Sequence, residues 1–218
     1  MDPSILKQIT VSALPILFAI TFHEASHGYV ANKLGDPTAK FTGRLTLNPL
    51  AHIDPVGTVL MPIMLLVLTH GQFMFGYAKP VPINPSNFKD PKRDMALSAA
   101  AGPLSNILLA VLSMIIIKFI VFPLYALLGG AGTAFFKPLS MMLQASVIFN
   151  VVLAVFNMIP VPPLDGGRVL VGLLPHKQAM AYSRIEPFGF LILILLISTG
   201  MTRFFVEPIV NLFLSILL

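Results

Sequence analysis

The stretch Ile9–Ala31, ITVSALPILFAITFHEASHGYVA, decides the fold of this chain. At about 1.5 Å per residue, a helix of this length crosses a hydrocarbon core of about 30 Å. Its first half is almost wholly apolar, but its second half carries His23, Glu24 and His27. Ionisable side chains are unfavourable inside a membrane span and by default mark a functional site. The stretch therefore predicts a membrane helix that carries a polar site.

The composition extends the membrane interpretation to the whole chain. Of the 218 residues, 56% are hydrophobic and 11% are charged, and the mean hydropathy is +0.86. Soluble domains are about 25% charged, so this chain cannot cover its outside with polar groups and must face lipid. The net charge of +5 and the pI of about 9.6 come from basic residues in short runs between apolar segments. This pattern indicates membrane orientation, and we expect no nucleic-acid binding.

The apolar segments predict an all-α polytopic membrane protein with about five to six membrane segments. Residues 1–218 form a single membrane-embedded domain, with a core over 9–175 and C-terminal membrane segments over 187–218. Further spans are expected within 95–122, 139–159, 188–199 and 204–218, the last two as two spans or a hairpin.

The region between the first and second full spans has a different pattern. Lys40–Leu47 alternates loosely, and Val81 and Ile83 lie among prolines, so a short β-hairpin or re-entrant region is expected. Residues 56–68 are apolar but short for a span. The segments 44–47 and 80–83 could take up an extended substrate as an added strand.

His23 and His27 are spaced for metal binding. Residues four apart lie on one face of a helix, so both imidazoles can share one zinc ion. Glu24 is offset around the helix, where it can reach a water molecule on the metal and act as a general base. A single histidine in an apolar helix is more often a packed side chain, but three polar groups inside a span must each be satisfied without water. The chain has no cysteine, so thiolate ligands are excluded.

Asp165 is the strongest candidate for a third ligand. It follows an apolar span in the stretch Asn157–Gly167, NMIPVPPLDGG, whose prolines break the helix and whose glycines let the backbone approach closely. Broken helix at membrane depth is tolerated where it lines a buried site. The alternative is that Asp165 caps a short helix beginning at Gly166 or Gly167 at the membrane surface.

The paired motifs resemble those of the site-2 protease family of intramembrane zinc metalloproteases. His23-Glu24-x-x-His27 and Asn157-x-x-Pro160-x-x-Pro163-Leu164-Asp165-Gly166-Gly167 carry the resemblance, and Ala101-Gly102-Pro103-Leu104-Ser105-Asn106 is similar to a third family marker. The loops over 48–57 and 76–81 are similar to those of the compact bacterial and archaeal branch. Many relatives carry a PDZ or CBS domain, for which this chain has no room.

The resemblance implies an activity and a set of site residues. One Zn²⁺ per chain is held by His23, His27 and Asp165, with Glu24 as the base and Asn157 binding substrate or the oxyanion. The implied substrates are membrane-anchored proteins or signal peptides, cut within or near their transmembrane segments. The alternatives are a membrane transporter of metal ions and a non-proteolytic pseudoprotease that binds helices.

Three further polar residues are candidates for contacting substrate or orienting a ligand: Asn106, His52 and Asp54. The alternative for Asn106, as for Asn157, is a hydrogen bond between helices. For His52 and Asp54 it is a turn in a cytoplasmic loop. We expect His70 and His176 to be interfacial and unrelated to the metal.

The metal site constrains the topology. If His23, His27 and Asp165 share one ion, the first span and the span ending near 159 run in the same direction, with one crossing between them. Residues 56–75 then form a re-entrant or peripheral hairpin. The segments on both its flanks are basic, which predicts a cytoplasmic location for both, an active site nearer the cytoplasmic face and an N-terminus outside. The expected location is a bacterial or archaeal cell membrane, and the oligomeric state is not indicated.

Overall fold

The computed structural model of the chain describes residues 3–68, 76–128 and 132–218, and every regular element in these ranges is a helix. The α-helices are α1 (Pro3–Leu34), α2 (Thr38–Phe41), α3 (Met61–Leu68), α4 (Pro91–Ile116), α5 (Phe122–Leu128), α6 (Thr133–Asn157), α7 (Asp165–Leu173), α8 (His176–Ser183), α9 (Gly189–Ser198) and α10 (Met201–Leu217). Short 3₁₀ turns are η1 (Pro49–His52), η3 (Pro85–Asn87) and η6 (Glu186–Phe188), and π-helical turns are η2 (Pro55–Leu60) and η4 (Ile117–Val121).

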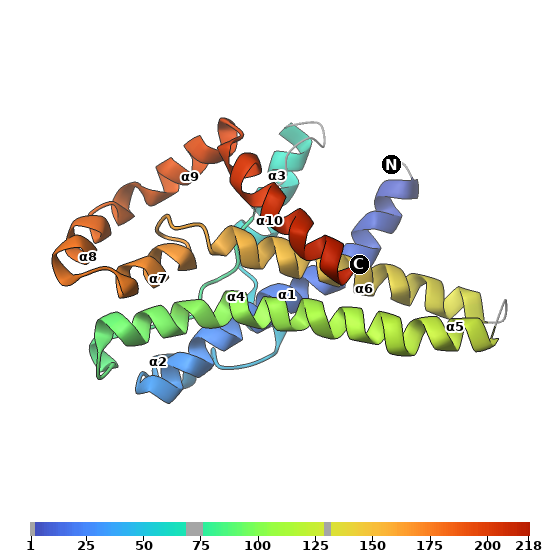
Figure 1. The fold of residues 1–218 in the computed structure, drawn as a ribbon, viewed down its shortest axis with the longest axis horizontal. Coiled ribbons are helices and arrows are strands. Elements are labelled where there is room, and N and C mark those ends of the chain that lie inside the picture. The colour runs from blue at the N-terminus through green and yellow to red at the C-terminus, as the bar shows by residue number, and fades with distance from the viewer. Residues whose placement is uncertain (1–2, 69–75, 129–131) are drawn as a thin grey trace.

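Helix α4 is the central element of the fold. It packs against α1, α6 and α7, and α6 also packs against α1 and α10. Figure 1 shows α1 crossing the pair formed by α4 and α6, with the carboxyl ends of α1 and α6 pointing the same way and α4 running opposite to both. This is the relative direction that a shared metal site requires.

The sequence explains where α4 begins and how it continues. Asp90 caps the helix by accepting a hydrogen bond from the Arg93 N–H, and Pro91 occupies the first turn, where its missing N–H has no consequence. The helix runs on through η4 into α5, so that Pro91–Leu128 is one apolar stretch of 38 residues. The π turn precedes Pro123, which cannot donate a hydrogen bond to the preceding turn.

Three helical stretches of the described residues are long and apolar enough to cross a membrane. They are Pro91–Leu128, Thr133–Asn157 and His176–Ser198. The last includes α8, which lies outside the span that the sequence predicted over 188–199. A total of five to six membrane segments, with α1 and α10 among them, stays a prediction.

The structure contains no strand in the described residues, so the expected β-hairpin is not found. Lys40 lies in α2 instead, and Gly43, with a φ of +68°, turns the chain after it. Residues 76–84 are extended, but Pro80 and Pro82 remove alternate N–H groups, which prevents a regular ladder. The η2–α3 unit projects away from α4 and α6 (Figure 1), and residues 69–75 of the predicted re-entrant segment lie outside the described residues.

The packed core is built from small and β-branched side chains rather than large ones. Its buried members on α4, η4, α6 and α10 are Ala110, Ile117, Val147, Val151, Val155 and Val210. The chain reaches α10 through a turn at Gly200, whose φ of +74° suits glycine, so α9 and α10 form the hairpin that the sequence allowed.

Candidate metal centre

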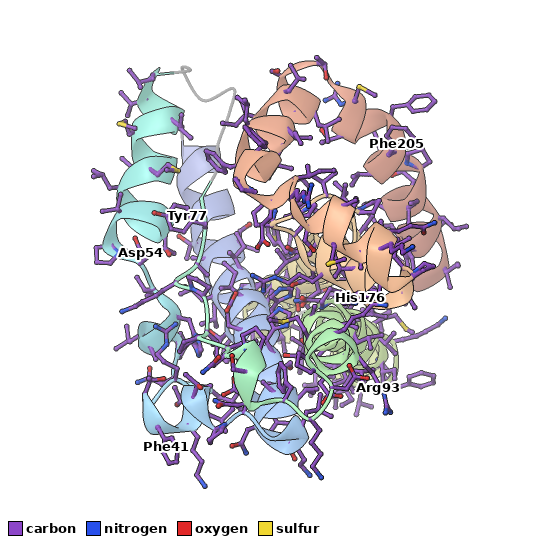
Figure 2. The ribbon with its side chains drawn as sticks, turned by 90° about the vertical axis from the view of Figure 1, so that its left-hand side faces the viewer. Phe41, Asp54, Tyr77, Arg93, His176 and Phe205 are labelled. Carbon is purple, nitrogen blue, oxygen red and sulfur yellow. The ribbon has the colours of Figure 1, made fainter. Side chains whose placement is uncertain are left out.

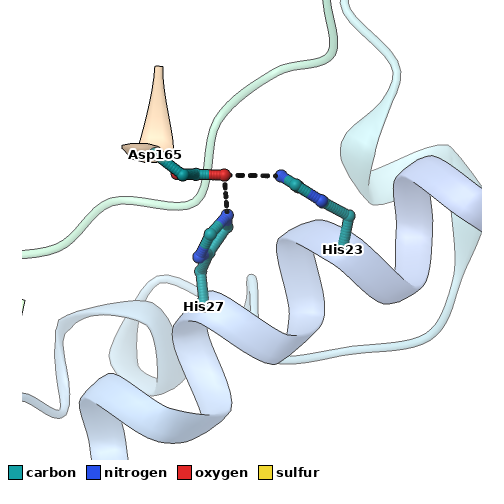
Figure 3. A group of neighbouring side chains, drawn as sticks. All are labelled: His23, His27 and Asp165. Carbon is teal, nitrogen blue, oxygen red and sulfur yellow. Dashed lines mark ion pairs between the residues drawn. The ribbon is translucent and has the colours of Figure 1, made fainter. Parts of the chain in front are cut away.

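The two histidines of α1 point at one carboxylate from another part of the chain. His23 and His27 lie on the same face of α1, and only 6% and 7% of their surfaces are exposed. Figure 3 shows both imidazoles directed at Asp165, the first residue of α7. Asp165 Oδ2 lies 3.1 Å from His23 Nε2 and 3.3 Å from His27 Nε2.

Hydrogen bonds behind the rings assign the protonation of both histidines. His27 Nδ1 lies 2.7 Å from the Ser98 carbonyl oxygen, which can only accept, so this nitrogen carries a proton. His23 Nδ1 lies 2.6 Å from Asn106 Oδ1, again an acceptor, and therefore also donates. In the neutral imidazole, the form that binds a metal, a donor at Nδ1 keeps its lone pair on Nε2. In that form both Nε2 atoms present lone pairs toward Asp165.

Three acceptor atoms thus converge in a buried space. Asp165 Oδ2 is fully buried and receives no hydrogen bond from any of the described residues. Such a cluster is unfavourable unless a proton or a metal cation lies among its members. Zinc bonds of about 2.0–2.1 Å in tetrahedral geometry place ligand atoms about 3.3–3.4 Å apart, close to the spacings between Asp165 and each imidazole. His23, His27 and Asp165 therefore fit a zinc ion, and their candidate ligand atoms all lie within 4.8 Å of one another.

Gly102 of α4 closes the centre on a third side. A Cβ at this position would lie 2.4 Å from His27 Nε2 and 2.7 Å from His23 Cε1, so only glycine leaves room for both imidazoles. The sequence offered Gly102-Pro103, within an otherwise apolar helix, as part of a motif but gave Gly102 no role. The Gly-Pro pair, which interrupts an apolar span, was the sequence feature that could have indicated a close contact here.

The loop before α7 folds tightly to present Asp165. Gly166 lies against the Met158 carbonyl, which a Cβ at this position would meet at 2.3 Å. A Cβ at Gly167 would meet the Pro162 nitrogen at 2.5 Å. The Pro162–Pro163 peptide is cis. Helix α7 begins at Asp165 with Leu164 as its N-cap, so the carboxylate faces the imidazoles and does not cap the helix.

Glu24 lies beside the metal centre but is held by a different segment. The side chain is half-buried, and its Oε2 accepts a hydrogen bond of 2.8 Å from the Val81 N–H. Val81 belongs to the extended residues 76–84, and its side chain packs so closely on α1 that a Cβ at Gly28 would lie 2.9 Å from it. The backbone of this segment therefore orients the predicted base.

Of the other two predicted polar residues on helices, one touches a ligand. Asn106 on α4 receives the His23 Nδ1 hydrogen bond, and its surface is fully buried. Asn157, at the end of α6, donates to the Leu153 carbonyl of its own helix at 2.9 Å. That bond directs its amide at α6 and not at the three ligands.

His52 and Asp54 make hydrogen bonds within their own loop, and none to the three ligands in the described residues. His52 Nε2 lies 2.9 Å from the Thr46 carbonyl, and Asp54 caps η2 by accepting from the N–H groups of Val56 and Gly57. Figure 2 shows Asp54 near Tyr77 and the foot of α3, on the other side of the molecule from His176. His176 is exposed at the start of α8, and His70 lies outside the described residues.

A bundle of apolar helices that brings a His-Glu-x-x-His turn against a buried aspartate defines a membrane metallopeptidase. The profile of peptidase family M50 matches residues 11–199, and the chain belongs to this family, the site-2 protease family.

Curated relatives agree with the family assignment. The chain is 37% identical over 202 residues to "Putative zinc metalloprotease YwhC" of Bacillus subtilis, a match that covers 91% of this chain and 84% of that protein. It is 28% identical over 196 residues to "Putative zinc metalloprotease Rip2" of Mycolicibacterium smegmatis, covering 88% of this chain and 68% of the relative. No solved structure matches the chain significantly.

Proposed function

We propose that the chain is an intramembrane zinc metalloprotease that hydrolyses peptide bonds within or near the transmembrane segments of membrane-anchored proteins or signal peptides. The activity would serve regulated intramembrane proteolysis. The observation that carries the proposal is the convergence of the His23, His27 and Asp165 acceptors beside Glu24 within an apolar helical bundle. Membership of a metalloprotease family supports it.

The chemistry follows from the residues around the centre. A zinc ion held by His23, His27 and Asp165 would supply a Lewis acid for the scissile carbonyl and would lower the pKa of a water molecule. Glu24 takes the proton of the attacking water and passes it to the leaving amine. The Val81 N–H restrains Glu24 through Oε2, which leaves Oε1 to take the proton.

Asn157 has a conditional role in this scheme. A hydrogen bond from its amide to the developing oxyanion would stabilise the transition state. The amide must first leave the Leu153 carbonyl to which it donates here. We propose that substrate binding turns it toward the metal.

The substrate must be unwound before attack, and the extended segment offers a place for it. Strand addition beside 80–83 and 44–47 would hold an extended substrate. Pro80 and Pro82 lack N–H groups, so this edge accepts hydrogen bonds at these positions but does not donate them.

We propose an integral, multi-pass protein of a bacterial or archaeal cell membrane, with the active site nearer the cytoplasmic face and the N-terminus outside. The basic flanks of residues 56–75 support this orientation. Single cysteines at Lys40 and Lys89, introduced into this cysteine-free chain, should react with an impermeant thiol reagent from the same side. Labelling from opposite sides would rule out a re-entrant segment 56–75.

Cleavage of a transmembrane reporter by the purified protein tests the activity, with Glu24→Gln as the variant. The glutamine oxygen can still accept from the Val81 N–H, so the substitution removes the base and leaves the contact. The expected result is one zinc per chain in both proteins and a rate at least about 100-fold lower in the variant. Equal rates in the two proteins, or no cleavage by the wild type, would contradict the proposed proteolytic activity.

A further inference from the structure

Behind His23, a line of polar side chains continues away from the metal centre into the contact between α4 and α6. Asn106 on α4 and Asn150 on α6 are 0% and 1% exposed, and Asn150 leads on to Ser146 and Ser113. The metal ligands and Glu24 do not explain why Asn150 is buried there. A polar group at this depth is unfavourable unless all its hydrogen bonds are made.

The hydrogen bonds along this line have a direction. Asn150 Nδ2 donates to the Ser146 carbonyl at 2.8 Å, which leaves Asn150 Oδ1 to accept from Asn106 Nδ2, also at 2.8 Å. Asn106 Nδ2 donates in addition to the Ala19 carbonyl at 3.1 Å. Asn106 Oδ1 then faces His23 and accepts a hydrogen bond from its Nδ1–H.

The carbonyls of Ser146 and Ala19 fix this direction, because a carbonyl oxygen can only accept a hydrogen bond. If the Asn150 amide were flipped, its oxygen would face the Ser146 carbonyl, and its NH₂ would face the NH₂ of Asn106. If the Asn106 amide were flipped, its oxygen would face the Ala19 carbonyl. Its NH₂ would then force His23 to accept at Nδ1 and to carry its proton on Nε2, the atom needed for the metal.

We propose that Asn150 is a positioning residue for the metal centre, which keeps His23 in its metal-binding tautomer by fixing the orientation of the Asn106 amide. The inference rests on the proposed zinc site. Groups that orient a metal-bound histidine typically change metal affinity about 10–100-fold when they are removed. Asn150 acts one hydrogen bond further out, through Asn106.

A simpler role for Asn150 would be adhesion between α4 and α6, and the two roles have different consequences. A purely adhesive residue contributes to stability, and its loss leaves zinc affinity unchanged whether or not Asn106 is present. A positioning residue contributes to zinc affinity only while Asn106 is present. A double-mutant cycle separates these cases, since residues that act through one another are not additive.

The test measures zinc affinity by chelator competition in detergent for wild type, Asn150→Leu, Asn106→Ala and the double variant. Ser113→Ala is the matched control, because Ser113 is buried on the same line and, within the described residues, its hydroxyl bonds Ser146 and not Asn150 or Asn106. We expect Asn150→Leu to bind zinc about 10-fold more weakly and to alter the absorption spectrum of the Co²⁺-substituted protein. The double variant should bind no more weakly than Asn106→Ala, and Ser113→Ala should match the wild type.

The result that would overturn the inference is wild-type zinc affinity in Asn150→Leu, additive losses in the cycle, or an equal loss in Ser113→Ala. If Asn150→Leu does not fold, ¹⁵N NMR of the metal-free wild type decides, because a proton on His23 Nε2 rather than Nδ1 would also overturn it. Failure of the wild type itself to bind one zinc per chain would instead refute the proposed function.

Discussion

Gly102 is the residue at which α4 touches both imidazoles of the candidate metal centre. The space that a Cβ would need at this position is already filled by His23 and His27. Elsewhere in a helix, alanine is more favourable than glycine by about 1 kcal/mol. A single methyl group at this position therefore opposes metal binding while it favours the helix.

Gly102→Ala should consequently lower zinc affinity by at least about 100-fold, because both imidazoles must move from the geometry that meets Asp165. The metal-free variant should unfold at or below the wild-type temperature, because overpacking the two buried imidazoles costs about 1–3 kcal/mol and offsets the gain in helix propensity. Zinc content and thermal unfolding measured on the same preparation check both statements. Leu104→Ala, at an exposed position of the same helix, is the control. Normal zinc affinity in Gly102→Ala would show that the imidazoles are not confined as the structure indicates.

The individual site residues that the sequence predicted are those whose neighbours lie close in the chain. His23, Glu24 and His27 follow from helical spacing, because residues four apart on one helix meet whatever surrounds them. Asp165 required a proline-broken span as a signal. Gly102 and Asn150 become significant only when α4 and α6 are placed against α1, and no periodicity specifies those contacts.

Among the elements, the extended residues 76–84 reach the site without being a strand. The N–H groups of Tyr77 and Lys79 donate to the carbonyls of Gly57 and His52, and that of Val81 donates to Glu24. Every second N–H of this segment therefore points to one side, as in a strand. The partners are two loop carbonyls and a side chain, which a sequence pattern cannot identify.

Val81→Pro removes the N–H that holds Glu24, in a segment that already carries Pro80 and Pro82. We expect kcat to fall by about 10-fold, as the base is less well oriented, with KM and zinc content unchanged. Val81→Ala is the matched control: it loses the contact with Gly28 but keeps the N–H. An equal loss of kcat in both variants would assign the effect to packing.

Asp36 ties the end of α1 to the residues that precede α4. Its carboxylate is fully buried and accepts from the Asn84 N–H at 2.7 Å, from Asn87 Nδ2 at 2.7 Å and from the Thr38 N–H and hydroxyl. Burial alone would raise the pKa of Asp36, but the hydrogen bonds from Thr38, Asn87 and Asn84 outweigh it and hold the pKa below its ordinary value of 3.8.

A pKa lower in the folded than in the unfolded chain means that ionised Asp36 stabilises the fold. This contribution is complete above the unfolded value of 3.8 and is lost as the pH falls through the lower folded value. Asp36→Asn should therefore expose residues 76–87 to hydrogen exchange at pH 7, with less change than the wild type on acidification below pH 4. Asp90→Asn, at the exposed cap of α4, is the control. Identical exchange in wild type and Asp36→Asn would show that Asp36 does not hold residues 84–87 against the end of α1.

For the molecule as a whole, the fold class followed from composition, and the relative direction of α1 and α6 followed from the requirement that one metal be shared. The family match and the apolar stretches Pro91–Leu128, Thr133–Asn157 and His176–Ser198 agree with a helical membrane protein. What composition could not supply was which helix lies at the centre. Helix α4 takes that place because its small residues admit α1 on one side and α7 on another, where Gly172 meets Ala96.

A zinc ion at the proposed site would join parts of the molecule that are distant in the chain, so its removal should affect global stability. His23 and His27 belong to α1 and Asp165 to α7, and an ion that binds only the folded arrangement stabilises it by about 4 kcal/mol at 1,000 times its Kd. Thermal unfolding in detergent should therefore shift upward with zinc and fall back with a chelator, while Asp165→Asn should show no such shift. Asp94→Asn, a buried aspartate at the start of α4, should retain it. A zinc-dependent shift that persisted in Asp165→Asn would mean that the ion does not link α1 to α7, and the metal would then have to be sought on α1 alone.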